Sequence, residues 1–478
     1  MALSTVARWP TERRVTLVVA LAVVLAPLNS TMIAVALPRV IEGFSITVPA
    51  AGWLVTGYLI SMASMQPLAG KLGDRFGRRR VMLLGLAVFG AASLLATFAP
   101  NYQTLLAARF LQAIAGASSM PNGAALVREL VPVERRGRGF GMVGVFTGIA
   151  AASGPPLGGL LVDLAGWRSI FLVNVPFVAA ALLAGWYWIP AGRHSTRDGA
   201  ARGSRDFDYL GAVMLPALLV GTASLLVFGA RGLVEPWVAA LWTAAAVAAA
   251  IIFVVIESRQ PDPVVQPAMY RSRTFAAANL AIGLSNLAMY TTLLGVPILL
   301  SARGSQSDFQ IGLVLTGLSA GMAVLAPVSG RLADRYGRRL PAVAGLCVMT
   351  AGSLLLAFSG ADIGLAALVV ALLVSGIGLG LAGTGMQTSA VESVPGSQAG
   401  AGSGMASTSR YFGSILGSAI LAGLVGGAGP SSGGFGRLFV VIATASALAA
   451  VAALALRAWP ARRDEPIAAL ATAHQEVG

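Results

Sequence analysis

Long, continuous apolar runs dominate this chain and restrict its fold more than any other feature. Short polar segments separate them, and only 11 % of the 478 residues are charged while 56 % are hydrophobic. A run of about 20 apolar residues spans a bilayer as an α-helix, because lipid offers no partner to an open backbone. The runs do not alternate in polarity, which excludes an outer-membrane β-barrel. We predict an all-α polytopic membrane protein with fourteen spans, near residues 15–37, 50–69, 81–99, 102–127, 139–162, 168–190, 209–230, 236–257, 274–301, 309–330, 341–359, 363–387, 403–426 and 437–458.

The basic residues predict an orientation and exclude a nucleic-acid partner. The formal net charge is +14, but the Lys and Arg residues are spread over short loops and form no single patch. When the loops are assigned alternately to the two sides, one side holds most of the 33 Lys and Arg residues. The positive-inside rule then predicts cytoplasmic N- and C-termini in a bacterial inner (plasma) membrane. The predicted external loops contain Arg39, Arg168, Arg231, Arg303 and Arg437.

Few residues in the chain could carry metal, redox or enzymatic chemistry. The single cysteine, Cys347, excludes an intrachain disulfide and a cysteine metal cluster. The two histidines, His194 and His474, fall in polar segments and are not credible metal ligands. The sequence contains no nucleophile–base pair or nucleotide loop, and its Gly-rich runs lie inside apolar spans. We predict no metal, no cofactor and no enzymatic activity.

One short segment occurs twice, as residues 70–80 and again as residues 330–340, each time between two apolar runs. Both copies are strongly basic, so both are expected on the cytoplasmic side, with an even number of spans between them. Our spans place eight there. The residues singled out are Gly70, Asp74, Arg75, Gly77 and Arg78 in the first copy, and Gly330, Asp334, Arg335, Gly337 and Arg338 in the second.

This doubled, Gly-rich and Arg-rich loop with one Asp resembles the signature loop of the major facilitator superfamily. The resemblance implies the major facilitator fold, in which two pseudo-symmetric six-helix bundles alternately open a central cavity to either side. It also implies that Asp74 and Asp334 latch the cytoplasmic side when the cavity opens outward. We expect Asp74 at the start of the third span, where a helix N-terminus favours a carboxylate. The alternative is that the loop only supplies charge for topology.

A minimal member of this superfamily has twelve spans. The two additional spans predicted here lie within residues 209–257. With them, the chain resembles the fourteen-span branch of the drug:proton antiporters, in which two extra helices sit between the six-helix bundles. The predicted organisation is a cytoplasmic N-terminus (1–14), the N-terminal bundle (15–190), a cytoplasmic linker (191–208), two extra helices (209–257), a second linker (258–273), the C-terminal bundle (274–458) and a cytoplasmic tail (459–478).

The fifth span carries a Gly-Pro motif. Proline removes a helix hydrogen bond and bends the helix, and flanking glycines let another helix pack closely. The segment resembles the antiporter motif of the superfamily, which implies export; generic glycine packing is the alternative. Ala150 stands where glycine is usual. The motif residues are Gly154, Pro155, Gly158 and Gly159.

Arg109 lies inside the fourth span, roughly 12 Å from its outer end at helical rise. A cation at that depth normally faces a cavity or a partner. The resemblance implies a role in proton coupling, and the alternative is an arginine that snorkels to the interface. Arg410 in the thirteenth span is a second candidate for coupling or for a counterion, and Asp163 on the external side is a further coupling candidate.

The first span departs from the family pattern at Asn29, where many members carry an aspartate. None of the 19 carboxylates falls in the middle of a predicted span. Proton antiport usually needs a carboxylate with a shiftable pKa, and a strongly cationic substrate would need a buried countercharge. The composition therefore favours a neutral or anionic amphiphile, with Arg109 and Arg410 as counterions.

Polar and methionine side chains within the spans are the candidates for the cavity wall. Polar residues in lipid-spanning helices are costly enough as a set to indicate a cavity, and methionine offers an adaptable surface. For each residue alone, ordinary helix packing is the alternative. The candidates are Asn29, Met32, Tyr58, Met62, Gln66, Gln112, Met120, Asn122, Asn286, Tyr290 and Gln387.

These features predict a monomeric secondary transporter that exports hydrophobic drugs or amphiphilic metabolites, with protons as the coupling ion and membrane lipids around it. A lipid-like amphiphile transporter with weak or no proton coupling is the second interpretation. A membrane sensor that has lost transport is the third. No soluble domain is visible in the sequence to support the sensor.

Overall fold

The computed structural model describes residues 10–132, 135–190, 209–229, 235–260, 267–304, 306–395, 399–425 and 432–458. The predicted linker 191–208 and tail 459–478 lie outside this part of the chain, as do most of the N-terminal segment 1–14 and residues 261–266 of the second linker. Within the described residues every regular element is a helix, as the apolar runs predicted.

Eight helices form the N-terminal half. They are α2 (Thr11–Phe44), α3 (Val48–Phe76), α4 (Arg78–Thr97), α5 (Tyr102–Gly116), α6 (Ser119–Leu130), α7 (Arg136–Ala165), α8 (Ser169–Leu172) and α9 (Asn174–Trp188). The predicted fourth span is thus two helices, α5 and α6, with Ala117 and Ser118 between them, and the sixth is α8 followed by α9.

The remaining helices form the C-terminal half and a separate pair. The pair is α11 (Tyr209–Gly229) and α12 (Pro236–Arg259). The C-terminal half consists of η2 (Pro267–Arg271), α13 (Arg273–Arg303), α14 (Asp308–Tyr336), α15 (Arg339–Ser359), η3 (Gly360–Asp362), α16 (Leu365–Glu392), α17 (Ala399–Val425) and α18 (Ser432–Ala453). Each of the fourteen predicted ranges overlaps at least one described helix, and eleven described helices are long and apolar enough to cross a bilayer.

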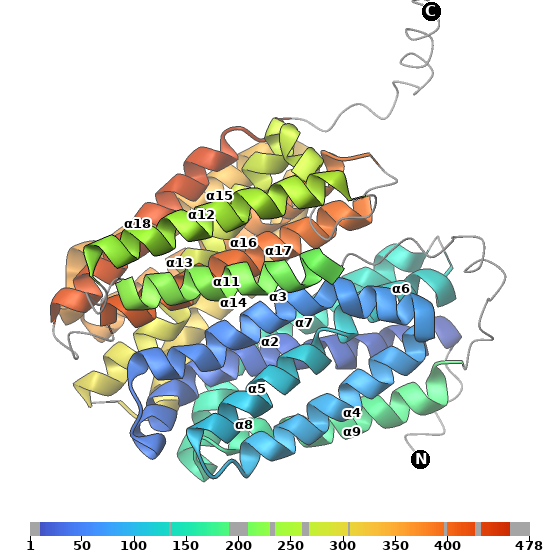
Figure 1. Ribbon diagram of the computed structural model, residues 1–478, viewed down its shortest axis with the longest axis horizontal. Coiled ribbons are helices and arrows are strands. Elements are labelled where there is room, and N and C mark those ends of the chain that lie inside the picture. The colour runs from blue at the N-terminus through green and yellow to red at the C-terminus, as the bar shows by residue number, and fades with distance from the viewer. Residues whose placement is uncertain are drawn as a thin grey trace, which may run out of the picture.

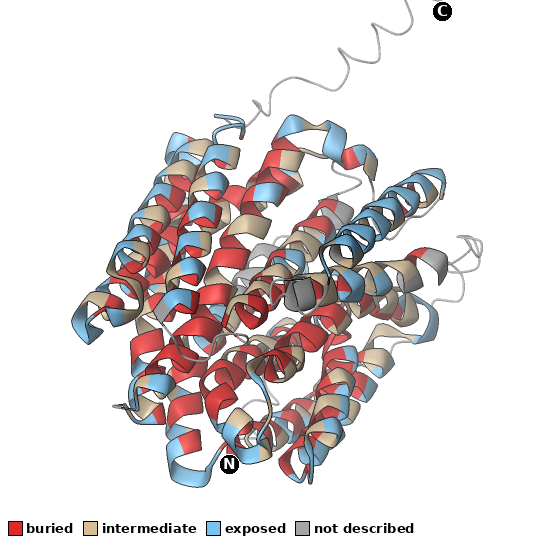
Figure 2. Cartoon of the chain, turned by 60° about the vertical axis from the view of Figure 1, so that its left-hand side comes forward, coloured by how far each residue is buried: buried red, intermediate tan, exposed pale blue. Residues whose placement is uncertain are grey.

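The two halves meet along three pairs of helices. In these pairs α2 packs on α13, α3 on α17 and α7 on α14. The separate helix α11 packs on both α3 and α17, and α12 packs mainly on α11 (Figure 1). Buried residues follow the inner helices and exposed ones the outer faces (Figure 2), as expected when lipid covers the outside. The extra pair therefore flanks the α3–α17 contact, and the α7–α14 contact has no such cover.

The repeated segment is largely helical, and its turn is a single glycine. Gly77 separates α3 from α4 with φ of 96°, and Gly337 ends α14 with φ of 82°. Side chains with a Cβ avoid this backbone region, so glycine is required at both turns. Asp74 consequently lies in the last turn of α3. The expectation that it opens the third span was wrong, because α3 continues past its apolar run into the polar segment.

The helix directions define two ends of the molecule. Gly77 and Gly337 lie at one end, which we call the motif end. Because α3 and α14 each have 29 residues, the other end is roughly 43 Å away at helical rise. That end contains Arg39 and the start of α14 at Asp308, and we call it the Arg39 end.

Candidate functional site between the two halves

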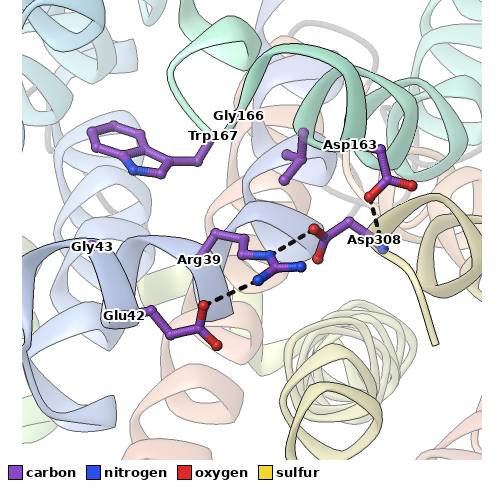
Figure 3. A pocket seen from close by; sticks show the side chains of 8 residues that line it. Arg39, Glu42, Gly43, Asp163, Gly166, Trp167 and Asp308 are labelled. Carbon is purple, nitrogen blue, oxygen red and sulfur yellow. Dashed lines mark hydrogen bonds and ion pairs between the residues drawn. The ribbon is translucent and has the colours of Figure 1, made fainter. Parts of the chain in front are cut away.

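An ion pair joins the two halves at the Arg39 end (Figure 3). Arg39 on α2 donates from Nε to Oδ2 of Asp308, the first residue of α14, at 2.7 Å. The Arg39 side chain is 47 % exposed, whereas that of Asp308 is only 5 % exposed. Glu42 accepts a second, longer bond of 3.2 Å from Arg39 Nη1. A buried carboxylate of one half therefore depends on a cation of the other half.

Asp163 adds a second link at the same end. Its carboxylate, near the end of α7, accepts a hydrogen bond from the backbone N–H of Asp308 at 3.1 Å (Figure 3). It also accepts one from the backbone N–H of Phe309 at 2.9 Å. These are unpaired donors at the N-terminus of α14, where the helix dipole favours negative charge. Ser307 caps α14 from its own half, so Asp163 reinforces the cap from the opposite half.

The backbones of α7 and α14 touch beside these polar links. A Cβ added at Gly159 would overlap the carbonyl oxygen of Asp308, and one added at Gly312 would overlap that of Pro155. On the other side of α7, a Cβ at Gly154 would overlap Thr31 of α2 and one at Gly158 would crowd Met32. The Gly-Pro motif thus brings α7 into close contact with both α2 and α14.

The aspartates at the motif end pair within their own halves. Arg78 binds Asp74 at 2.8 Å and Glu129 at 3.1 Å. Arg338 binds Asp334 at 2.8 Å and Glu392 at 2.9 Å. The hydrogen bond with Glu392 raises the pKa of the Arg338 guanidinium. For these described side chains, every ion pair stays inside one half.

Arg75 and Arg335, the adjacent arginines of the repeat, stack on the following aromatic rings of Phe76 and Tyr336. A Cβ added at Gly70 would lie 3.6 Å from Cβ of Pro121, whereas one added at Gly330 would have no atom within 4 Å. The structure therefore brings these residues together within each copy of the motif and does not join the two copies.

Arg109 is enclosed in the N-terminal half. It is 1 % exposed, and its guanidinium donates to Asn29 Oδ1 at 2.6 Å, to the Leu54 carbonyl at 3.2 Å and to Gln112 Oε1 at 3.3 Å. The ring of Tyr58 lies 4.2 Å from Cζ. The Arg109 side chain is buried among helices and does not extend to the membrane–water interface. The snorkelling alternative is therefore wrong for this arginine.

Three polar atoms around this arginine are buried without a partner among the described residues. They are Arg109 Nη2, Asn29 Nδ2 and Tyr58 Oη. A buried donor without a partner costs about 1–3 kcal/mol. The surroundings of Arg109 can therefore donate further hydrogen bonds to a ligand or to water.

Polar bonds cross between the halves near this arginine. Ser30 bonds the hydroxyl of Tyr290 at 2.8 Å, and Gln66 donates to Tyr411 at 3.0 Å. Within the C-terminal half, Arg410 donates to Gln387 Oε1 at 2.9 Å, with its side chain exposed.

The structure places the other predicted cavity residues less favourably. Asn122 binds the carbonyls of Ala69 and Ser118 and so ties α6 to α3. Asn286 binds the carbonyl of Ile282 in its own helix. Met32 and Met62 are buried in the packing, and Met120 is 50 % exposed.

Sequence reasoning missed Arg39, Asp308 and Tyr411 as site residues. Arg39 and Asp308 were treated only as residues of loops and span ends, and their partnership depends on a fold that joins distant segments. Tyr411 had one signal, its position beside Arg410 inside an apolar span.

A model of the Major Facilitator Superfamily matches residues 19–268 and 278–476 of the chain. The uncharacterized MFS-type transporter YvkA of Bacillus subtilis is 32 % identical over 445 residues, which cover 93 % of this chain and 96 % of that protein. Two drug-related proteins are also similar. Multidrug resistance protein Stp of Mycobacterium tuberculosis is 32 % identical, with 82 % of this chain and 72 % of Stp covered. The tetracenomycin C resistance and export protein of Streptomyces glaucescens is 31 % identical, with 86 % and 75 % covered.

Solved structures share the fold at low identity. A D-xylose-proton symporter superposes with a TM-score of 0.66 at 13 % identity, covering 94 % of this chain and 98 % of the symporter. The nucleoside transporter NupG superposes with a TM-score of 0.62 at 13 % identity, covering 94 % of this chain and 99 % of NupG. At this identity the likeness establishes the fold alone.

Proposed function

Because the chain belongs to the Major Facilitator Superfamily, and is thus a secondary transporter and not an enzyme, we propose that it exports hydrophobic or amphiphilic small molecules from a bacterial cell. The observation that carries this proposal is the asymmetry of the contacts between the halves. They seal the Arg39 end with Arg39, Asp163 and Asp308, while the motif-end pairs stay within each half. A transporter that alternates between two states has such an arrangement in one of them.

The orientation follows as a second part of the proposal. We assign the motif end to the cytoplasm because its loops carry most of the basic residues. The state described here is then open toward the cytoplasm, where an exporter collects its substrate. The Asp74 and Asp334 segments would close that side in the opposite state. In support of export, relatives named for drug resistance and antibiotic export are about one-third identical.

Fourteen spans are also part of the proposal. Helices α11 and α12 cover the predicted ranges 209–230 and 236–257, and they pack beside the two halves. We propose that both cross the membrane as the extra pair of the fourteen-span antiporters. A reporter fusion between α11 and α12, within residues 230–234, tests this count, because it should report an external position only if both helices cross the membrane. Fusions within the linkers 191–208 and 258–273 should both report a cytoplasmic position.

Protons are the proposed driving ion. The support is the resemblance to drug:proton antiporters together with the position of Asp163 and Asp308, whose protonation would alter a contact between the halves. Proteoliposomes with an imposed pH gradient provide the test. Export of a fluorescent drug should accelerate when the side facing the Arg39 end is acidified. Transport that is the same with and without the gradient would contradict proton antiport.

A specific pocket favours the second candidate, a transporter of lipid-like amphiphiles. The α7–α14 contact, which α11 does not cover, contains a mostly apolar pocket of about 450 Å³. Fluorescent phospholipid in the same proteoliposomes would distinguish the candidates, because only a lipid transporter should move it between leaflets. The pocket is lined by Ala152, Ser153, Pro156, Leu157, Leu160, Phe309 and Thr316.

A further inference from the structure

Two arginines, one from each half, lie inside helices and away from the helix ends. Arg109 belongs to α5 of the N-terminal half and Arg410 to α17 of the C-terminal half. In α17, Arg410 lies 11 residues after the first described residue, Ala399, or roughly 16 Å along the helix. Both positions fall inside spans predicted from the sequence, 102–127 and 403–426, where a cation is costly without a negative partner.

Tyrosines connect these two charges into one cluster. The Tyr58 ring stacks on Arg109 at 4.2 Å. Tyr290 is hydrogen-bonded to Ser30, the residue after the Asn29 that binds Arg109, and it is close enough to Arg109 and Arg410 to interact with their charges. Tyr411 lies within range of Arg410 and of Tyr290. We call these five residues the central cationic cluster, and it extends from one half to the other.

The hydrogen-bond partners of the two arginines in this cluster are neutral. Arg109 binds the side chains of Asn29 and Gln112 and a backbone carbonyl, and Arg410 binds Gln387. Each described ion pair elsewhere joins residues near helix ends. The cluster therefore carries two positive charges that no carboxylate is seen to balance in the described part of the chain.

Unused donors accompany this charge. Arg109 Nη2 and Asn29 Nδ2 are buried donors without a partner among the described residues. The buried hydroxyl of Tyr58 also has no partner there. Buried charges in proteins are normally paired. A region with excess positive charge and free donors is complementary to an anion.

We propose that the central cationic cluster binds the acidic group, such as a carboxylate or sulfonate, of an amphiphilic substrate. This inference rests on the proposed export function and names the class of molecule exported. Arg410 is exposed and makes the direct contact, with Gln387 holding its guanidinium in place. Arg109 is buried against the Tyr58 ring and contributes a fixed positive charge. The apolar body of the substrate lies against the surrounding helices.

The direct test is the binding of three dansyl probes that differ in charge. Dansylglycine is anionic, dansylamide is neutral and dansylcadaverine is cationic, while their aromatic bodies are the same. Binding to the purified full-length protein in nanodiscs of zwitterionic lipid is followed by energy transfer from tryptophan. A charge-assisted hydrogen bond contributes enough that dansylglycine should bind about 10- to 100-fold more tightly than dansylamide. Dansylcadaverine should bind most weakly of the three.

Variants of Arg410 identify the residue responsible. Arg410→Gln should reduce the affinity for dansylglycine to that for dansylamide, and Arg410→Lys should retain most of the preference. Arg437→Gln is the matched control, because Arg437 is an exposed arginine of α18 with no role in the cluster. It should bind all three probes like the wild type. The thermal unfolding of each variant shows that it is folded.

Two outcomes would overturn the inference. One is tighter binding of dansylcadaverine than of dansylglycine by the wild type. The other is an unchanged preference for dansylglycine in Arg410→Gln. The export function fails separately: if the wild type shows the anion preference in nanodiscs but moves none of the probes in proteoliposomes, the site stands and export is refuted.

Discussion

The two ends of this molecule carry similar charged groups, but in the described part of the chain only one end uses them to join the halves. At the Arg39 end, Asp308 is 5 % exposed and pairs with an arginine from the other half. At the motif end, the side chains of Asp74 and Asp334 are 63 % and 78 % exposed. Each pairs with the arginine four residues later in the sequence. Whether an aspartate joins the two halves thus depends on which residue it pairs with, and the presence of the aspartate is not sufficient.

Because the aspartates at the two ends differ in burial, their ion pairs contribute different free energies to the conformation described here. Exposed ion pairs contribute about 0–1 kcal/mol, so the motif-end pairs add little to the state described here. A buried carboxylate that loses its partner is much more costly. The Arg39 end therefore stabilises this conformation, whereas the aspartates of the motif end remain available for the opposite one. Three predictions test this contrast, each measured as the population of the conformation with a closed Arg39 end.

The largest effect is expected from Gly159→Ala on α7. Its new methyl group would overlap the backbone carbonyl of Asp308, which cannot move aside as a flexible side chain could. Overpacking costs about 1–3 kcal/mol, occasionally more, and the overlap with a backbone oxygen places this variant at the upper end. It should therefore open the Arg39 end in a large fraction of molecules. Gly148→Ala on the same helix is the matched control, because no atom lies within 4 Å of a Cβ there. Equal populations in the two variants would refute the backbone seal.

A smaller effect is expected from Arg39→Gln, which leaves the buried carboxylate of Asp308 without its cation. Hydrogen bonds to charged groups contribute about 1.5–3 kcal/mol, so the closed population should fall by about one to two orders of magnitude relative to the open one. Adding Asp308→Asn should restore part of the loss, because the buried charge is then absent. An additive loss in the double variant would show that the two residues do not act as a pair.

The smallest effect on the same measurement is expected from Asp74→Asn and Asp334→Asn. Each removes an exposed pair between residues four apart in the sequence, so the population should change by less than about 1 kcal/mol. Transport should nevertheless slow strongly, because the latch for the opposite state is weakened. Wild-type transport rates in both variants would contradict the latch, and a population shift as large as that of Arg39→Gln would contradict the contrast between the ends.

Much of the fold follows from local sequence signals. Apolar runs gave the helices, and the repeated segment gave the relation between the halves, since both depend on neighbouring residues and on the bilayer. The repeat singled out Gly77, where the turn lies, but it did not predict the extent of α3, because helical hydrogen bonding continues beyond the apolar run. The breaks at Ala117 and Val173 were missed for a similar reason, since hydropathy does not register a local change of helix geometry.

The site was predictable only in part. The polar residues within apolar spans indicated that Arg109 would be buried beside Asn29, Tyr58 and Gln112. The Arg39–Asp308 pair was not, because it joins residues 269 positions apart, and no local pattern encodes such a distance. Asp163 was predicted as a coupling residue, and the structure adds a cap on α14 that only the packed halves create.

The account depends on reciprocal motion of the two ends, and spin-label distances measure it most directly. In a Cys347→Ser background, one label pair at Ser45 and Ala302 reports the Arg39 end, and another at Arg80 and Leu340 reports the motif end. All four positions are exposed. We predict that Gly159→Ala lengthens the first distance and shortens the second. A longer first distance with an unchanged second distance would contradict the alternation of the two ends.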